Sequence, residues 1–108
     1  MKHPVRGEVW LVDLGMTAKV RPCLIMSIAI SDIDRALVTL VPHTTSTRAT
    51  SFEASVPTPF LRAGAFDVQG LATVPVTRAI RLLGKLNQEQ LRSVEVALCR
   101  WLDLPCTW

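Results

Sequence analysis

The sequence predicts a mainly β, α+β fold in which a small, barrel-like antiparallel sheet precedes one C-terminal amphipathic helix. Short runs of β-forming residues, separated by turn-forming residues, occupy the chain as far as Leu86. After Asn87 the apolar residues change to a helical spacing. Many short strands followed by one helix favour a curled sheet with the helix packed on one side. The 108 residues, of which 49% are apolar, fit a single domain spanning residues 1–108.

Six runs have the composition expected of strands, and they span residues 7–13, 21–28, 36–42, 52–56, 66–74 and 80–86. Turn residues at 14–19 make the first two runs a hairpin. Pro22 has no backbone donor, so it is expected at the start of its strand or on an edge strand. Arg21 would then lie at the beginning of that strand. Pro42 is expected to end the third run, which is apolar enough to be covered on both faces. Gly70 suggests a bulge or a close backbone approach within the fifth run.

The last segment has the pattern of a capped helix. Asn87, with Gln90 three residues later, predicts a capping box at its start. Five apolar residues then share one helical face: Leu91, Val94, Leu98, Trp101 and Leu102. We expect Trp101 to lie in the core or in an interface.

Charge and hydropathy narrow the class of protein. The net charge of +3 and pI of about 9.1 favour polyanionic partners without proving that one binds. Every apolar run ends well before the roughly 18 residues that a membrane-spanning helix requires. The N-terminus lacks the pattern of a secretory signal, so a cytoplasmic protein is expected.

The three cysteines are odd in number and widely spaced. Cys23, Cys99 and Cys106 do not form a paired metal-binding pattern. We therefore expect buried structural thiols, with Cys106 exposed near the end of the chain, in place of a disulfide framework or a zinc site.

Chemistry-bearing residues gather at two places. Phosphate-binding glycine loops, dinucleotide fingerprints and metal-spaced clusters are missing from the sequence. The remaining candidates for a functional site are Arg21 at the beginning of a predicted strand and a hydroxyl-rich loop at 43–51. A guanidinium with nearby hydroxyls suits a phosphodiester. The alternative is that Arg21 pairs with a surface carboxylate and that the loop is a solvated connection.

Three segments resemble the MazF/PemK toxin family: RGEVWLVDL at 6–14, VRPCLI at 20–25 and VPHTTS at 41–46. RAI at 78–80, GKL at 84–86 and LDL at 102–104 are also similar to the family pattern. Within the first motif we interpret Glu8 as a strand-end carboxylate that accepts nearby donors and Trp10 as an apolar anchor.

The resemblance implies an SH3-like or barrel-like sheet with a C-terminal amphipathic helix, a homodimer, and an acidic antitoxin partner. It further implies metal-independent, sequence-specific cleavage of single-stranded RNA to 2′,3′-cyclic phosphate and 5′-hydroxyl ends, which inhibits translation and growth. No cofactor is implied, because the nucleophile is the RNA's own 2′-hydroxyl.

Carried over residue by residue, the resemblance assigns Arg21 and Thr44 as the catalytic arginine and threonine. The residues expected to bind RNA are Thr45, Ser46, Arg48, Arg78 and Arg81.

One position departs from the family pattern. Many members carry an acidic residue just before the segment matching Arg78, and in some it is the general base; here that position is Pro75, and Thr73 stands where some members have an arginine. The local candidates for a general base are His43, Glu53 and Asp67. A neighbour along a strand points to the opposite face, so a structural or surface role for His43 is favoured over catalysis beside Thr44.

The departure leaves two other functions open. Residues 72–76 are similar to a segment of CcdB, a toxin of the same fold that poisons DNA gyrase, and this chain also ends in a tryptophan, Trp108. A third possibility is an inactive module that keeps only antitoxin binding.

Overall fold

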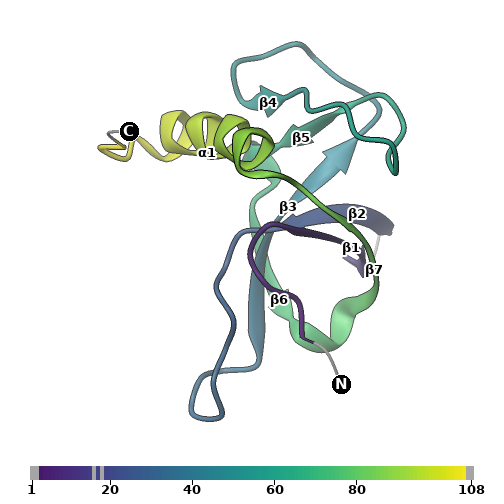
Figure 1. Ribbon diagram of the computed structural model, residues 1–108, viewed down its shortest axis with the longest axis vertical. Helices are drawn as coiled ribbons and strands as arrows, with labels where there is room; N and C mark the ends of the chain where they lie inside the picture. The colour runs from purple at the N-terminus through teal and green to yellow at the C-terminus, as the bar shows by residue number, and fades with distance from the viewer. Residues whose placement is uncertain (1–2, 16, 18, 107–108) are drawn as a thin grey trace.

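The computed structural model describes residues 3–15, 17 and 19–106, and in this part of the chain seven strands precede one α-helix (Figure 1). The strands are β1 (Glu8–Asp13), β2 (Val20–Ile25), β3 (Leu37–Thr44), β4 (Glu53–Ala54), β5 (Ala65–Asp67), β6 (Ala72–Pro75) and β7 (Ala79–Lys85), and the helix is α1 (Gln88–Leu102). The predicted mainly β fold with a C-terminal helix is confirmed. Among the described residues, no helix is long and apolar enough to cross a membrane.

The strands form an antiparallel sheet in the order β4-β5-β3-β2-β1-β7, and β6 pairs with the N-terminal part of β3. The predicted hairpin of β1 and β2 is confirmed, with Trp10 opposite Cys23. β3 is the organising strand: its centre pairs with β2, its start with β6 and its end with β5. Figure 1 shows β3 running from the β6 side of the molecule toward β5 and α1.

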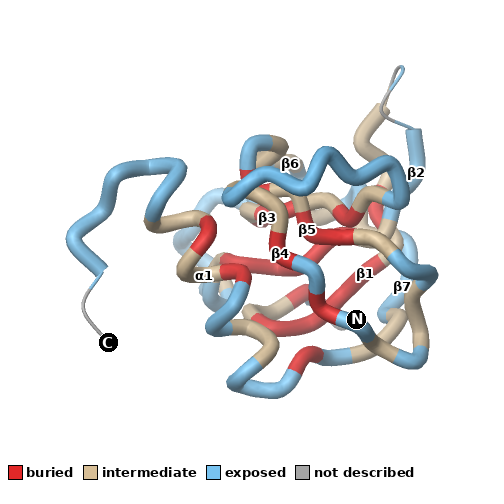
Figure 2. Tube along the Cα trace, turned by 90° about the horizontal axis from the view of Figure 1, so that it is seen from above, coloured by how far each residue is buried: buried red, intermediate tan, exposed pale blue. Residues whose placement is uncertain are grey.

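The sheet buries a core on both faces because adjacent residues of a strand point in opposite directions. One cluster contains Val9, Leu24 and Val41, which are paired across β1, β2 and β3, and it is covered by Val94 and Ala97 of α1. The other cluster is formed by Trp10, Val12, Cys23, Ile25, Val38 and Leu40. Figure 2 shows the buried central strands enclosed by exposed connections. The expectation that the third strand is covered on both faces holds at its centre, where Leu40 and Val41 are buried in different clusters, whereas Leu37 at its start is 38% exposed.

The helix begins where the sequence predicts. The Asn87 side chain accepts from the Gln90 N–H at 2.8 Å, and the Gln90 side chain accepts from the Asn87 N–H at 2.8 Å, which completes the capping box. Of the predicted face, Val94 is buried and Leu91 and Leu98 pack against the core, whereas Trp101 and Leu102 are each 43% exposed. Trp101 contacts the Phe52 ring, with 5.2 Å between centroids.

The single strand expected at 66–74 is wrong. β5 ends at Asp67, a 3-10 turn occupies Val68–Gly70, and β6 begins at Ala72. The Asp67 carboxylate accepts from the Gln69 N–H at 3.1 Å and so starts the turn. Gly70 is required there, because a Cβ would lie 2.7 Å from Cγ of Pro42. The close approach predicted for Gly70 is thus present, but it interrupts the strand.

The expectation that Pro42 ends the third strand is also wrong. β3 continues to Thr44, since Pro42 lacks only its own donor and the next two residues pair with β5. His43 and Thr44 therefore belong to a strand, and the hydroxyl-rich loop begins at Thr45.

Two of the three cysteines form a disulfide, which corrects the prediction of structural thiols. Cys99 and Cys106 are bonded, with 6.1 Å between their Cα atoms. The pairing depends on Asp103, whose left-handed backbone (φ 54°) caps α1 and turns the chain back along the last helical turn. Cys23 is a buried free thiol, as predicted, and burial raises its pKa to about 12 against a smaller opposing effect of the Arg21 charge.

Candidate active site

The candidate site lies where β2 begins and β3 ends. These strands are antiparallel neighbours, so the start of one and the end of the other meet at the same edge. Their last pair is Cys23 with Pro42, and the same register continued by two residues places Arg21 opposite Thr44. Beyond Cys23 and Pro42 the two strands are no longer paired, and Arg21 and Thr44 both line a space at this edge of the sheet.

This space, which we call the basic cavity, has a volume of about 770 Å³. Arg21, His43, Thr44, Thr45, Ser46 and Arg81 of the predicted site all line it. Among the described residues that line it, four are lysine or arginine, namely Lys19, Arg21, Arg62 and Arg81, and none is aspartate or glutamate. Such a cavity favours an anion, and guanidinium groups match phosphate oxygens in geometry as well as in charge.

The hydroxyl groups lie on the β3 side of the basic cavity. The Thr44 Oγ1 atom accepts from the Ser46 N–H at 3.0 Å, which holds Thr44 and the start of the loop in one turn. Thr45 and Ser46 are exposed. The fixed Thr44 hydroxyl and the loop beyond it therefore provide donors that can approach a ligand in the cavity.

His43 combines a core position with access to the basic cavity. It is 6% exposed, and its ring packs edge-on against Phe66 with 5.1 Å between centroids. Burial lowers the pKa of His43 below its ordinary 6.5, so the imidazole is neutral at neutral pH. A structural role, favoured from the sequence, agrees with this packing, and His43 is also among the residues that line the basic cavity.

The structure places the remaining predicted residues outside the basic cavity. The Arg78 guanidinium lies 3.9 Å from the Asp13 carboxylate, and Arg48 lies in the loop before β4, with its N–H bonded to Glu53. Asp67 starts the 3-10 turn described above, and Glu53 lines a different, adjacent pocket. Pro75 and Thr73 pair with the N-terminal part of β3, opposite Leu37 and Thr39.

Two basic residues of the cavity, Lys19 and Arg62, were missed from the sequence. Lys19 ends the first hairpin turn, where its carbonyl accepts from the Leu14 N–H at 2.8 Å. Lys19 lies two residues before Arg21 in the predicted hairpin, and this spacing could have indicated that it belongs to the same site. Arg62 belongs to the connection between β4 and β5, and nothing in its local pattern indicates that this connection folds over the start of β2.

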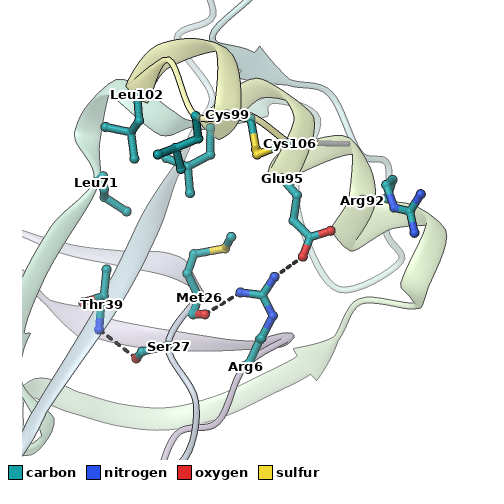
Figure 3. Close-up of a pocket in the computed structure, with 12 residues that line it drawn as sticks. Arg6, Met26, Ser27, Thr39, Leu71, Arg92, Glu95, Cys99, Leu102 and Cys106 are labelled. Atoms are coloured by element: carbon teal, nitrogen blue, oxygen red, sulfur yellow. Dashed lines mark hydrogen bonds and ion pairs between the residues drawn. A yellow bond between two sulfur atoms is a disulfide. The ribbon is translucent and has the colours of Figure 1, made fainter. Parts of the chain in front are cut away.

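A second cavity lies between α1 and the sheet, with a volume of about 620 Å³ (Figure 3). In Figure 3 the Arg6 guanidinium bridges the Glu95 carboxylate and the Met26 carbonyl. Its charged lining residues are Arg6, Arg92 and Glu95, and much of the remaining lining is apolar, so its excess of positive charge is smaller than that of the basic cavity.

Glu8 and Trp10 have the structural roles predicted for them. Glu8 is 5% exposed, and its Oε1 atom accepts from the Val5 N–H and from Trp10 Nε1, each at 3.0 Å. Trp10 packs in the cluster with Val12 and Cys23.

Residues 5–102 match the PemK-like, MazF-like toxins of type II toxin-antitoxin systems. The chain belongs to this toxin family. A mycobacterial endoribonuclease solved in complex with its cognate antitoxin is 25% identical to this toxin, with a TM-score of 0.82 over 96% of this chain and 99% of the other.

Two further structures extend the comparison. Mycobacterium tuberculosis toxin MazF-mt6 is 25% identical to this MazF-like toxin, with a TM-score of 0.74 over 94% of this chain and 99% of the other. MazF from Deinococcus radiodurans, at 18% identity, has the same fold, with a TM-score of 0.82 over 96% of this chain and 100% of the other.

Proposed function

We propose that this toxin is an endoribonuclease that cuts single-stranded RNA by metal-independent transesterification. The observation that carries the proposal is the basic cavity, in which the strand register brings Arg21 and Thr44 together among four cationic side chains. The similarity to a mycobacterial endoribonuclease supports the same activity.

In this reaction the RNA supplies the nucleophile. The 2′-oxygen bonds to the adjacent phosphorus, and the bond from that phosphorus to the 5′-oxygen of the next nucleotide breaks. One proton leaves the 2′-hydroxyl and one reaches the departing oxygen, so the products are a 2′,3′-cyclic phosphate and a 5′-hydroxyl. The protein orients the reacting groups, neutralises the charge on phosphorus and moves protons.

Arg21 and Thr44 are the proposed catalytic residues. The Arg21 guanidinium stabilises the negative charge that develops on the phosphorane oxygens. The Thr44 hydroxyl donates to a phosphate oxygen, while Thr45, Ser46, Lys19, Arg62 and Arg81 hold the flanking phosphates and riboses.

His43 is the proposed proton acceptor. Of the three candidates for a general base, His43 lines the basic cavity, whereas Glu53 and Asp67 are not among its lining residues. Its lowered pKa keeps the imidazole neutral and able to accept the 2′-hydroxyl proton at neutral pH. The departing 5′-oxygen takes its proton from water, and the protonated His43 returns its proton to the hydroxide that remains, so protons balance over the step.

We propose two protein partners. Ile80 and Leu82 are 53% and 40% exposed on β7, the edge strand beside β1, and a second copy of the chain would cover them. A flexible acidic antitoxin would bind the basic cavity and exclude RNA. One related endoribonuclease was solved with its cognate antitoxin.

Purified toxin incubated with mixed-sequence RNA in EDTA tests the proposed function. We expect cleavage with cyclic-phosphate and 5′-hydroxyl ends, and Arg21→Ala should lower the rate roughly 10²- to 10³-fold, the effect of removing one preorganised donor to an oxyanion. Arg35→Ala, an exposed position in the loop between β2 and β3, removes the same charge outside the cavity and should cleave normally.

Three results would contradict the proposal: normal cleavage by Arg21→Ala, cleavage that requires added metal, or trapping of gyrase without RNA cleavage. The last would favour the CcdB-like alternative, whose terminal Trp108 lies outside the described residues. Antitoxin binding without either activity would indicate an inactive binding module.

A further inference from the structure

A second pocket opens beside the basic cavity, and its chemistry is the opposite. This carboxylate pocket has a volume of about 470 Å³ and shares Thr45 with the basic cavity. Its polar side chains are the hydroxyls of Thr45, Thr47 and Ser55 and the carboxylate of Glu53, and in the part of the chain that the structure describes no lysine or arginine lines it. The volume lies in the range of small-ligand sites.

Strand alternation explains why Glu53 points into this pocket. Ala54 and Phe66 are a cross-strand pair of β4 and β5, and both are buried in the core cluster. Residues one position away on each strand must face the other way. Glu53 and Ala65 therefore lie on the outer face of this strand pair, together with Ser55 just beyond β4, and all three line the pocket.

Gly64 brings the carboxylate pocket against the proposed catalytic strand. A Cβ at this residue would lie 2.1 Å from the Thr44 carbonyl oxygen, so the backbone approaches β3 as closely as a glycine allows. A ligand that spans Thr45 would thus contact both cavities at once.

We propose that the carboxylate pocket selects a nucleobase of the RNA, an inference that rests on the proposed function. The negative phosphates of a bound strand favour the four cations of the basic cavity and are repelled by Glu53. The part of a nucleotide suited to a carboxylate and hydroxyl groups is an uncharged base with hydrogen-bond donors on its edge.

The carboxylate sets which bases fit. The Glu53 carboxylate only accepts hydrogen bonds, and its Oε1 atom already accepts from the Arg48 N–H at 2.8 Å. A carboxylate has about four acceptor positions, so capacity remains for a base. Guanine offers two adjacent donors, N1–H and the 2-amino group, and cytosine and adenine each offer an amino group. Uracil is disfavoured, because its single N3–H lies between two carbonyl oxygens that Glu53 repels.

Glu53→Gln separates base selection from the structural role of Glu53. The amide oxygen still accepts from the Arg48 N–H and holds the loop, while the amide nitrogen becomes a donor inside the pocket. The matched control is Glu89→Gln, which makes the same change at an exposed position in the first turn of α1. Equal melting temperatures of the three proteins would show that each is folded.

The test uses a random-sequence RNA library with 2′-fluoro groups, which lacks the attacking hydroxyl and so reports binding without cleavage. Sequences retained by the wild-type toxin, Glu53→Gln and Glu89→Gln are compared position by position, and cleavage ends of ordinary RNA provide a second measure. We expect one position at which wild type and Glu89→Gln favour guanine over uracil by about 5- to 150-fold, the range for one bidentate base contact. At that position Glu53→Gln should lose the preference and accept uracil.

The proposal is overturned if Glu53→Gln selects the same bases as wild type, or if wild type binds RNA without preferring amino-bearing bases at any position. A Glu53-dependent base preference without cleavage of ordinary RNA would support the pocket and refute the ribonuclease proposal. If cleavage depends on Arg21 but the bases at the cleavage site do not change in Glu53→Gln, the ribonuclease proposal is supported and the role of the carboxylate pocket is refuted. Failure to bind either RNA would refute both.

Discussion

Gly64→Ala should slow RNA cleavage, because the added methyl group would clash with the backbone of Thr44. The added Cβ would lie 2.1 Å from the Thr44 carbonyl oxygen, whereas ordinary contacts begin near 3.4 Å, so the backbone at Thr44 or at residue 64 must move by more than 1 Å. A displacement of this size at a reacting group costs roughly 10²-fold in rate. The accompanying overpacking should destabilise the fold by about 1–3 kcal/mol, which lowers the melting temperature by about 4–13 °C.

Gly70→Ala is the matched control, because its Cβ would meet the Pro42 ring at 2.7 Å and not a backbone atom of Thr44. Thermal denaturation and initial cleavage rates of both variants separate the two effects. We expect Gly70→Ala to lose stability while keeping most of its cleavage rate. A Gly64→Ala protein with the melting temperature and cleavage rate of wild type would refute the reasoning.

Two further predictions concern buried titratable groups. Burial lowers the pKa of His43 in the folded protein, so on acidification the unfolded chain binds a proton at this residue first. The free energy of unfolding should therefore fall as the pH drops below 6.5. In His43→Gln the part of this fall that is due to His43 should disappear, as measured by urea unfolding between about pH 5 and 8. A His43→Gln protein with an unchanged pH profile would contradict this. Glu8→Ala leaves the Val5 N–H and the Trp10 indole N–H without their Glu8 acceptor and should lower the free energy of unfolding by about 2–4 kcal/mol. Glu8→Gln keeps a carbonyl acceptor and should lower it by less. Equal losses of stability in the two variants would contradict the structural role of Glu8.

Features that depend on near neighbours in the chain were predictable. The capping box of Asn87 and Gln90 is formed by residues three apart and has the same form in any fold that contains the helix. The β1–β2 hairpin likewise joins neighbouring segments. Arg21 and Thr44 were selected by family motifs, and register pairing later explained why these two residues lie at one edge of the sheet.

Features that depend on distant segments were mispredicted. Pro42 would end β3 only if the next two residues had no strand to pair with, and β5 provides that strand. The segment 66–74 has the composition of one strand, yet its two ends pair with opposite ends of β3 and a 3-10 turn must connect them. The disulfide of Cys99 and Cys106 was also mispredicted although it is local, with a sequence separation of 7, because it depends on the left-handed cap at Asp103, which the cysteine spacing does not reveal.

The sequence by itself determined the fold class, the toxin family and the chemical character of the site, because strand and helix periods and the motifs around Arg21 and Thr44 are local patterns. The tertiary structure alone decided which charged groups share a cavity. Glu53 and His43 were both candidates for a general base in the sequence, where a structural or surface role was favoured for His43. In the structure the pairing of β4 with β5 directs Glu53 away from the basic cavity, while β3 carries His43 to its wall. That separation follows from the register of strands distant in sequence, and it is the physical reason for assigning phosphate and base to different pockets.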